Sequence, residues 1–294
     1  MAWLAANPQP AIVTAGVYTT SGVLDIPAGA DLVFADATII PTNPALSSLR
    51  LRGAGTKLTF AGTCRIGAVG ARNSRLGNAE AAGLEFERAS GFTITADALT
   101  IEGVAQVGIF SYRGSHDGVV AGKITAINTG ADSFHVTDGS YNLDFRATLL
   151  SVGSGDDGFA VVSYLSNGVR VRNVHWHDVT VRNQRWGRGI SVVGGEGVTV
   201  DHGDVDGSAG AGVYIAAEPQ YNTFGVDGVT MNVRVRNPNT QRIHDANVVV
   251  YSAQQGQTIT NVSLTVDADP AWLLVRKTGA YPVSNVAVNG VAVS

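Results

Sequence analysis

The stretch Thr-Gly-Ala-Asp-Ser-Phe-His-Val (129–136) returns as Ser-Gly-Asp-Asp-Gly-Phe-Ala-Val (154–161), and this repetition predicts the fold. In both copies, small and acidic residues precede a short run of alternating apolar side chains. The unit recurs along the chain, and its first apolar residues are Ile109, Phe134, Phe159, Ile190, Val213, Val248 and Leu273. They follow one another in steps of 25, 25, 31, 23, 35 and 25 residues. A repeat of about 20–50 residues indicates a solenoid.

A second series of strand-like segments lies between these units. Its members begin with Gly or Asn and span 118–120, 142–145, 168–171, 197–200, 228–231, 261–264 and 285–288. A third series follows in places, as in 123–127 and 178–181. Short segments with period-two alternation, separated by Gly, Asn, Asp and Ser turns, predict β structure throughout.

Two or three short strands in each repeat of about 25 residues predict an all-β protein, namely a single-stranded right-handed parallel β-helix with about ten coils. A leucine-rich repeat needs a Leu and Asn pattern that is missing here, and a propeller blade needs about 40 residues. Coils about 4.8 Å apart would build a rod of about 50 Å. Such a rod is long enough for an extended polymer site.

The chain is expected to form one domain over residues 1–294, because a solenoid grows by repetition and needs no second core. The regular coils are assigned to 100–294. Residues 1–99 are assigned to an N-terminal cap and irregular first coils, and 72–82, rich in Gly, Asn and Ala, to a loop. A content of 36 Gly with only 15% charged residues agrees with an all-β solenoid.

Partners and compartment are only weakly constrained. The first eight residues have neither the charged n-region nor the apolar h-region of a signal peptide, and no segment approaches 18 uninterrupted apolar residues. Membrane insertion is therefore not expected. Cys64 is the single cysteine, so no internal disulfide is expected. A net charge of −4 without a basic run argues against nucleic acid as a partner.

Stacking the repeats brings three carboxylates onto one predicted face. Asp132 and Asp157 occupy the same position of successive repeats, and Asp156 is adjacent. Because like charges that close repel, the pKa of at least one carboxyl should rise, giving a protonated acid beside an ionised base. Glycosidic cleavage needs such a pair. The alternative is ordinary turn chemistry, since Asp-Asp-Gly is also a common turn sequence.

Further polar residues are expected near the three carboxylates, whereas the remaining aspartates of the repeats are not. The outward column of the strand, expected to face solvent, carries His135, Ser191 and Tyr214, and Arg188 precedes it. Six further aspartates have no acidic partner in the stacking and are interpreted as turn residues: Asp138, Asp144, Asp178, Asp201, Asp204 and Asp206.

The segments 128–134, 155–161 and 187–191 resemble the polygalacturonase family of glycoside hydrolases. That family has Asn-Thr-Asp, Asp-Asp and Gly-His-Gly segments on consecutive coils of a right-handed β-helix. A similar arrangement occurs in β-helical dextranases, α-1,3-glucanases and some phage tailspike depolymerases. The resemblance implies hydrolysis with inversion, with Asp156 as general acid and with Asp132 and Asp157 activating water. It also implies an extracellular or phage-virion location and a monomer or homotrimer.

Two departures from the family change the expected substrate. Arg188 stands where the family has its histidine, and the Arg-Ile-Lys segment that grips a galacturonate carboxylate falls on Tyr214-Ile215-Ala216. The expected substrate is therefore a non-pectic glycan, such as a neutral glucan or a bacterial surface polysaccharide. Arg188 is expected to orient the carboxylates or to bind a substrate hydroxyl, and the alternative is a simple salt bridge with Asp157.

Aromatic and histidine side chains supply candidate sugar contacts. Trp186, Tyr214, Tyr164 and Tyr221 are candidate platforms for sugar rings, and the alternative for each is packing under a loop. His135 is a candidate polar group of the substrate site, and its alternative is an exposed histidine without a role.

Cofactor and metal sites are not expected. His175-Trp176-His177-Asp178 places two imidazoles on one face of a strand, but no third ligand is evident in register, and zinc needs three or four. Two other functions remain open. A β-helical polysaccharide lyase would use the acidic cluster for calcium, with Arg188 as its sole candidate base. A phage tail protein or adhesin would bind glycan without cleaving it.

Overall fold

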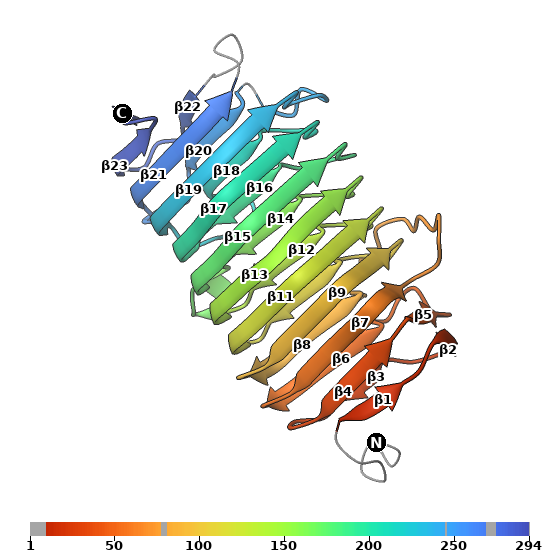
Figure 1. The fold of residues 1–294 in the computed structure, drawn as a ribbon. Helices are drawn as coiled ribbons and strands as arrows, with labels where there is room; N and C mark the ends of the chain where they lie inside the picture. The colour runs from red at the N-terminus through yellow and green to blue at the C-terminus, as the bar shows by residue number, and fades with distance from the viewer. Residues whose placement is uncertain (1–9, 78–80, 245, 269–274, 294) are drawn as a thin grey trace.

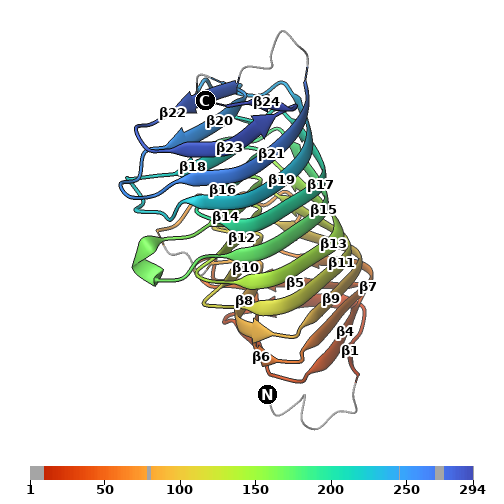
Figure 2. The same cartoon turned by 90° about the vertical axis from the view of Figure 1, so that its left-hand side faces the viewer.

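The computed structural model describes residues 10–77, 81–244, 246–268 and 275–293, and over these ranges the protein is all-β with a mostly parallel sheet. One turn of 3-10 helix, η1 (Leu165–Asn167), is the helical element of the described ranges. Strands stack one above another from the N-terminal to the C-terminal end, and η1 projects from one side (Figures 1 and 2). The predicted all-β class is confirmed.

One row of the stack, the short-strand row, consists of strands that pair in parallel with the next member. Its members are β3 (Leu24–Ile26), β6 (Leu49–Ala54), β8 (Leu84–Ser90), β10 (Ile109–Tyr112), β12 (Phe134–Thr137), β14 (Phe159–Val162), β16 (Ile190–Val193), β18 (Val213–Ala217), β20 (Val248–Ser252) and β22 (Val275–Thr278). The predicted register, with Phe134 opposite Phe159 and Phe159 opposite Ile190, is confirmed.

The register was wrong at the last repeat. Val248 pairs with Val275 and not with Leu273, which lies outside the described residues. Residues two apart on a strand face the same side, so alternation alone could not distinguish the two alignments. At the other end Leu24, Leu49, Leu84 and Ile109 pair in series. The N-terminal third, which repeats less clearly in sequence, thus continues the same row.

The other row, the long-strand row, is built from strands that also pair in parallel with their neighbours. Its members are β4 (Asp31–Ala35), β7 (Lys57–Ile66), β9 (Thr93–Glu102), β11 (His116–Ile127), β13 (Tyr141–Val152), β15 (Arg172–Arg182), β17 (Glu196–Asp206), β19 (Val226–Arg236), β21 (Ile259–Ala268) and β23 (Val283–Val288). The second and third predicted series are one strand here, because β11 spans both 118–120 and 123–127.

Four of the strands in the described ranges lie outside the two rows. At the N-terminal end, β1 (Ala11–Val13) pairs with β4, while β2 (Gly16–Thr20) pairs with β5 (Ala37–Pro41). At the C-terminal end, β24 (Val291–Ala292) pairs antiparallel with β23. The opening residues 1–9, on which the absence of a signal peptide was predicted, lie outside the described residues. The predicted loop has no regular structure over 72–77, and 78–80 also lie outside them.

The core beneath the aspartate-bearing turns is aromatic. Phe134 and Phe159 are buried and stack with ring centroids 4.7 Å apart, and Phe159 meets the buried Trp176 edge-on at 5.6 Å. Burying each such side chain is worth about 1.5–3 kcal/mol. The strands that carry the candidate site therefore rest on a rigid base.

The outward column of the short-strand row is not open to solvent, which corrects the prediction. Phe110, Ala160, Ser191, Tyr214 and Val249 are each at most 6% exposed. Several of them form small apolar clusters of their own, separate from the main core. These side chains are therefore packed against other residues of the protein.

Five of the six aspartates interpreted as turn residues lie instead in long strands: Asp144 in β13, Asp178 in β15, and Asp201, Asp204 and Asp206 in β17. Only Asp138, with φ 54°, lies in a turn. Turn chemistry was a poor guide because each strand residue has a charged or polar partner: Arg146 for Asp144, His202 for Asp178, His175 for Asp201, Arg182 for Asp204 and Asn237 for Asp206.

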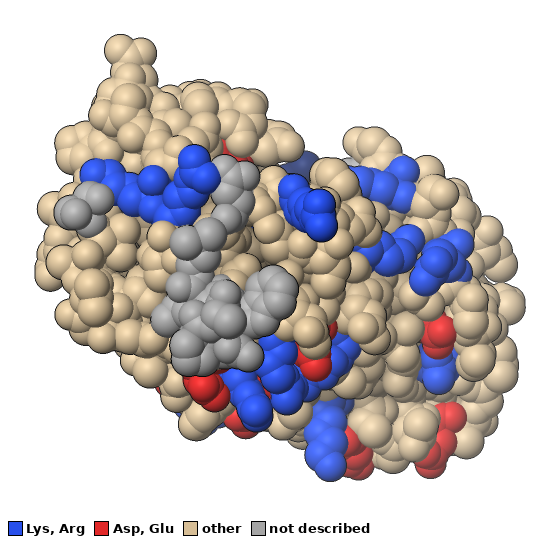
Figure 3. Space-filling model, turned by 90° about the horizontal axis from the view of Figure 1, so that it is seen from above, with Lys and Arg blue, Asp and Glu red and all other residues tan. Residues whose placement is uncertain are grey.

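Charged side chains on the face seen in Figure 3 lie in several separate groups, some of mixed sign, rather than in one continuous basic stripe. Among the residues that the structure describes, no helix is long and apolar enough to cross a membrane.

Candidate functional site

The turns that enter β12 and β14 are built alike. The hydroxyl of Thr129 donates to the carbonyl of Ala131 (2.9 Å), and the hydroxyl of Ser154 donates to the carbonyl of Asp156 (2.9 Å). The turns also pack closely, since a Cβ at Gly155 would lie 2.2 Å from the carbonyl oxygen of Gly130. Glycine and a hydroxyl residue at these positions therefore place the aspartates of both repeats in the same orientation.

Asp132 uses both carboxylate oxygens. Oδ1 accepts a hydrogen bond from the backbone N–H of Asp157 (2.8 Å), and Oδ2 contacts Nδ1 of His135. The side chain is buried. Asp132 thus connects its own repeat to the next and orients the His135 ring, whose Nε2 is buried and meets no hydrogen-bond partner among the described residues.

Asp157 repeats this arrangement one coil further on. Its Oδ1 accepts from the backbone N–H of Arg188 (2.6 Å), and its Oδ2 accepts from the hydroxyl of Ser191 (2.5 Å). The Arg188 guanidinium lies 3.6 Å from Oδ2. Burial raises the pKa of Asp157, and Asp132 adds to this, whereas Arg188 and Ser191 oppose it by stabilising the carboxylate.

Asp156 differs from its two neighbours. Its Oδ2 forms an ion pair with Arg75, and its other oxygen meets no donor among the residues described. The side chain is 19% exposed, compared with 7% for Asp157. Burial and the charges of Asp132 and Asp157 raise the pKa of Asp156 to about 7, against the opposing effect of Arg75 and Arg188.

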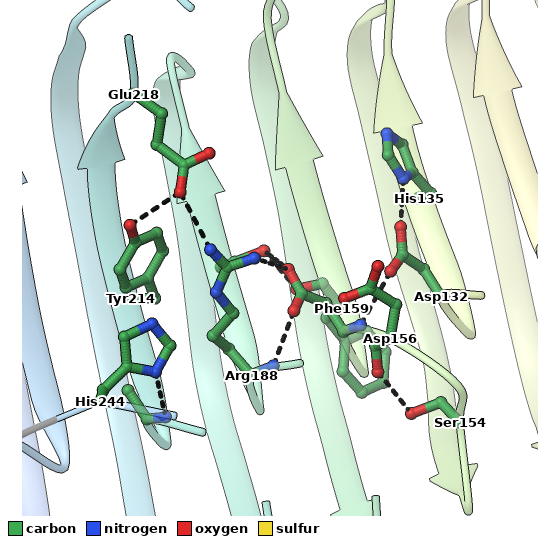
Figure 4. A network of polar contacts seen from close by, with 12 residues as sticks. Asp132, His135, Ser154, Asp156, Phe159, Arg188, Tyr214, Glu218 and His244 are labelled. Carbon is green, nitrogen blue, oxygen red and sulfur yellow. Dashed lines mark hydrogen bonds and ion pairs between the residues drawn. The ribbon is translucent and has the colours of Figure 1, made fainter. Parts of the chain in front are cut away.

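Arg188 lies between the aspartates and Glu218, as Figure 4 shows. Its Nη2 donates to Oε1 of Glu218 (2.9 Å), which also accepts from the hydroxyl of Tyr214 (2.7 Å). The guanidinium stands 4.3 Å over the Tyr214 ring. Burial lowers the pKa of Arg188, but Asp157 and Glu218 outweigh it and raise the pKa above its ordinary value. The salt bridge expected for Arg188 is therefore present.

Two adjoining cavities of ≈ 100 and ≈ 290 Å³ open beside these side chains and form one cleft. They share Arg75, Asp132, His135 and Tyr164. The first also reaches the other two aspartates, Arg188 and Glu218, and the second extends toward Phe110. The cleft therefore runs across several repeats, with Asp132 where the cavities meet and Asp156 and Asp157 in the first cavity.

The predicted aromatic platforms are only partly in place. Tyr164 and Tyr221 line the cleft, and burial raises the pKa of Tyr164 to about 12. Tyr214 is buried beneath Arg188 and bonded to Glu218, so the prediction that it offers a sugar platform was wrong. Trp186 is 52% exposed and does not line either cavity.

Two charged residues of the cleft, Arg75 and Glu218, were not predicted from the sequence. Arg75 comes from the long loop between β7 and β8, whose path no periodicity predicts. Glu218 follows β18 directly and lies two and four residues after Ala216 and Tyr214, so strand alternation places it on their face. That alternation was a usable signal, and burial raises the pKa of Glu218 as it does that of Asp157.

Gly187 closes the wall of the site next to the aspartates. Its φ of 78° lies in the left-handed region that favours glycine. A Cβ there would lie 2.6 Å from Oδ1 of Asp156 and 2.6 Å from the backbone N of Asp157. Any larger residue would therefore displace the acidic pair.

The three aspartates each bring an oxygen within 4.8 Å of the others, a spacing at which carboxylates can hold a cation. However, both oxygens of Asp132 and of Asp157 already face donors. A cation would have to displace those donors, whereas a proton on Asp156 displaces none. The arrangement fits proton transfer better than cation binding.

No protein-family model, curated protein or solved structure matches this chain.

Proposed function

We propose that the chain is a right-handed parallel β-helix of about ten coils, similar to the polygalacturonase-like glycoside hydrolases, and that it hydrolyses a polysaccharide. The two rows of in-register parallel strands support the fold. The three carboxylates at matching positions of adjacent repeats support the activity. A cleft that crosses several repeats is suited to a polymer rather than to a small molecule.

The difference between Asp156 and its neighbours is the observation that carries this proposal. Asp156 is the most exposed of the three carboxyls, and its pKa of about 7 leaves a large protonated fraction near neutral pH. Asp132 and Asp157 accept backbone and side-chain hydrogen bonds on their carboxylate oxygens, which leaves Asp156 as the carboxyl with an oxygen open to the cleft. We assign the acid to Asp156 and the base to Asp132 or Asp157, the two roles that glycosidic cleavage requires.

In the proposed reaction, Asp156 donates its proton to the leaving glycosidic oxygen as the bond to the anomeric carbon breaks. The proton of the attacking water passes to Asp132 or Asp157, and its oxygen forms the new bond to the anomeric carbon. The unpartnered Nε2 of His135 is placed to bond a substrate hydroxyl. Arg188 holds Asp157 in position and does not need to contact the sugar.

The substrate proposed is a non-pectic glycan. Arg188 is already engaged by Asp157 and Glu218, so it is not free to grip a uronate carboxylate. Arg75 is paired with Asp156. Tyr164 and Tyr221 provide rings against which neutral sugars can pack. Such polymers lie outside cells, so the proposal places the protein in the extracellular space or on a phage virion, as a monomer or homotrimer.

Direct attack by water, as in the proposed reaction, inverts the configuration of the anomeric carbon. The family resemblance implies inversion, which in general needs carboxyls about 6.5–9.5 Å apart, whereas retention goes with about 5–5.5 Å. The aspartate oxygens lie within 4.8 Å of one another. NMR of the anomeric proton in the first product distinguishes the two, because an inverted product contradicts the general rule and a retained product contradicts the resemblance.

The test is a panel of neutral and bacterial surface polysaccharides, scored for reducing-end release. Asp156→Asn, Asp132→Asn and Asp157→Asn should each lower release by at least about 100-fold while glycan binding persists, because acid–base catalysis contributes about 10²–10⁴-fold. Asp178→Asn, on an exposed aspartate of the long-strand row, is the matched control and should keep full activity.

Three outcomes would overturn the proposal. Full hydrolysis by Asp156→Asn would show that Asp156 is not the acid. Binding without any release by the unmodified protein would assign it to the phage-tail or adhesin class. Unsaturated products that absorb ultraviolet light and disappear with a calcium chelator would assign it to the lyases.

A further inference from the structure

A second group of titratable side chains lies on the long-strand row, away from the cleft. Asp144 of β13, His175 and His177 of β15, and Asp201 of β17 form this group, here called the histidine cluster. Asp144 pairs in register with His175. Trp176 pairs with Val200 and Asp178 with His202, which places Asp201 beside His177. Three successive repeats therefore contribute to one cluster.

The polar atoms of the histidine cluster are in close contact. Nε2 of His177 lies 3.0 Å from Oδ1 of Asp144, and its Nδ1 lies 3.2 Å from Oδ2 of Asp201. Nε2 of His175 lies 2.8 Å from the same oxygen of Asp201. The two imidazole rings stack with centroids 3.9 Å apart. Asp144 thus supplies a third potential ligand in register with the histidines, so the prediction that no third ligand lies in register was wrong.

His177 stands between the carboxylates of Asp144 and Asp201. A neutral imidazole has one N–H and can donate to one carboxylate only. His177 nevertheless faces a carboxylate oxygen with each of its ring nitrogens, and His175 faces one of the same two carboxylates. Imidazole nitrogens and a carboxylate oxygen are thus gathered at one place, as a metal site requires.

The surroundings suit a bound ion. The four side chains are between 27% and 38% exposed, so an ion can enter from solution. Arg146 donates to Oδ2 of Asp144 (2.6 Å), which leaves Oδ1 directed at the histidines. Hydrogen bonds of this kind orient ligands in metal sites. Asp201 likewise orients His177, because its Oδ2 lies next to Nδ1 of that ring.

We propose that Asp144, His175 and His177 bind a divalent transition-metal ion of the zinc type, and that Asp201 orients the histidines. Imidazole nitrogen and carboxylate oxygen are ordinary zinc ligands, at about 2.0–2.2 Å from the metal. Their donor atoms already lie within 4.8 Å of one another, so small side-chain rotations bring them into one coordination sphere. A hard ion such as calcium would instead require oxygen ligands alone.

An ion at this place would tie β13 to β15, with Asp201 of β17 holding the ligands. The site lies on the long-strand row and shares no residue with the cleft, so its proposed contribution is to stability and not to hydrolysis. Because the unfolded chain does not hold the three ligands together, zinc should bind the folded state preferentially and raise the melting temperature.

The experiment uses the full chain after treatment with a chelator. Zinc chloride is titrated by calorimetry, and cobalt(II) is added separately to record its visible absorption. We expect one zinc ion per chain, a rise in melting temperature with zinc concentration, and the visible absorption that cobalt(II) shows when it has few ligands.

Asp201→Asn should lower zinc affinity by about 10–100-fold, as for other residues that orient ligands. His177→Ala and Asp144→Asn each remove a ligand and should lower zinc affinity by more than Asp201→Asn does.

The matched control is His202→Ala. His202 lies 3.5 Å from Asp178 on the same two strands, β15 and β17, but without a second imidazole. Its loss should leave zinc binding unchanged. Asp144→Asn keeps the size of its side chain and is decisive if His177→Ala fails to fold.

Three results would overturn the proposal. Zinc affinity that is unchanged in both His177→Ala and Asp144→Asn would do so. Loss of zinc binding in Asp156→Asn would place the ion in the cleft instead. Absence of binding, with two imidazolium signals in the NMR spectrum at neutral pH, would show that protons alone hold the cluster together.

Discussion

The cleft and the histidine cluster both arise from the stacking of successive repeats, but they differ in burial and in neighbouring charges. Both stack titratable side chains from successive repeats, about 4.8 Å apart along the axis. In the cleft, burial and neighbouring aspartates raise the pKa of Asp156 to about 7. At the histidine cluster, Arg146 and His177 outweigh the effect of burial and lower the pKa of Asp144. Burial and the charge of the neighbours, rather than the repeat, therefore decide whether a stacked carboxyl keeps a proton.

Removing the buried cation of the cleft should have the largest effect on stability. In Arg188→Met, the carboxylates of Asp157 and Glu218 lose their shared partner while remaining buried. Leaving a buried charge unpaired costs about 3–5 kcal/mol, so the free energy of unfolding in urea should fall by about that amount at neutral pH. Arg146→Met at the half-exposed cluster is the comparison and should cost at most about 1 kcal/mol. Equal losses would contradict the distinction between the two regions.

The stability lost in Arg188→Met should partly return in acid. Protonation of Asp157 and Glu218, whose pKa values burial already raises, removes the uncompensated charges. Urea denaturation at two pH values measures this recovery.

The fold could be predicted because its register depends on side chains that repeat. Phe134 and Phe159 occupy equivalent positions, and the large aromatic side chain has room only in the core. Val275 was misaligned because residues two apart are equivalent by alternation. The N-terminal strands went unrecognised as regular coils because the step from Leu49 to Leu84 contains a long loop.

The candidate site could be predicted only where it belongs to the repeat. Asp132 and Asp157 share one position, and each accepts the backbone N–H of the same position in the next coil. Arg75 could not be found, because its loop has no periodicity. The burial of Tyr214 depends on Glu218 and Arg188 closing over it, which alternation along one strand does not reveal.

The pH dependence of hydrolysis should show whether Asp156 acts as the catalytic acid or is only a turn residue. Because Asp156 must be protonated to act as the acid, kcat/KM should fall about tenfold for each pH unit above a value near 7. The folded-state pKa exceeds the usual 3.8, so its contribution to stability is present below about pH 4 and is lost as the pH rises toward 7. This fall of kcat/KM at high pH is the alkaline limb of the pH profile. If it persists in Asp156→Asn, another group causes it.

Arg75→Ala should move that limb further. Arg75 opposes the rise in the pKa of Asp156, so its removal raises that pKa and shifts the alkaline limb to higher pH. The side chain is 58% exposed, so the folded state should lose little stability. The measurement is the pH profile of kcat/KM for both proteins. A limb shifted toward lower pH would mean that Arg75 keeps Asp156 protonated, contrary to its charge.

The smallest effect is expected on the long-strand row, at the pair of His202 and Asp178. Their side chains are 75% and 57% exposed and 3.5 Å apart. An exposed pair of this kind contributes little, because water screens the charges and both side chains lose freedom. His202→Ala should change the free energy of unfolding by no more than about 0.5 kcal/mol, with or without zinc. If His202→Ala lowers the free energy of unfolding by more than this, and only when zinc is present, then His202 contributes to zinc binding. The histidine cluster would then include His202 and Asp178.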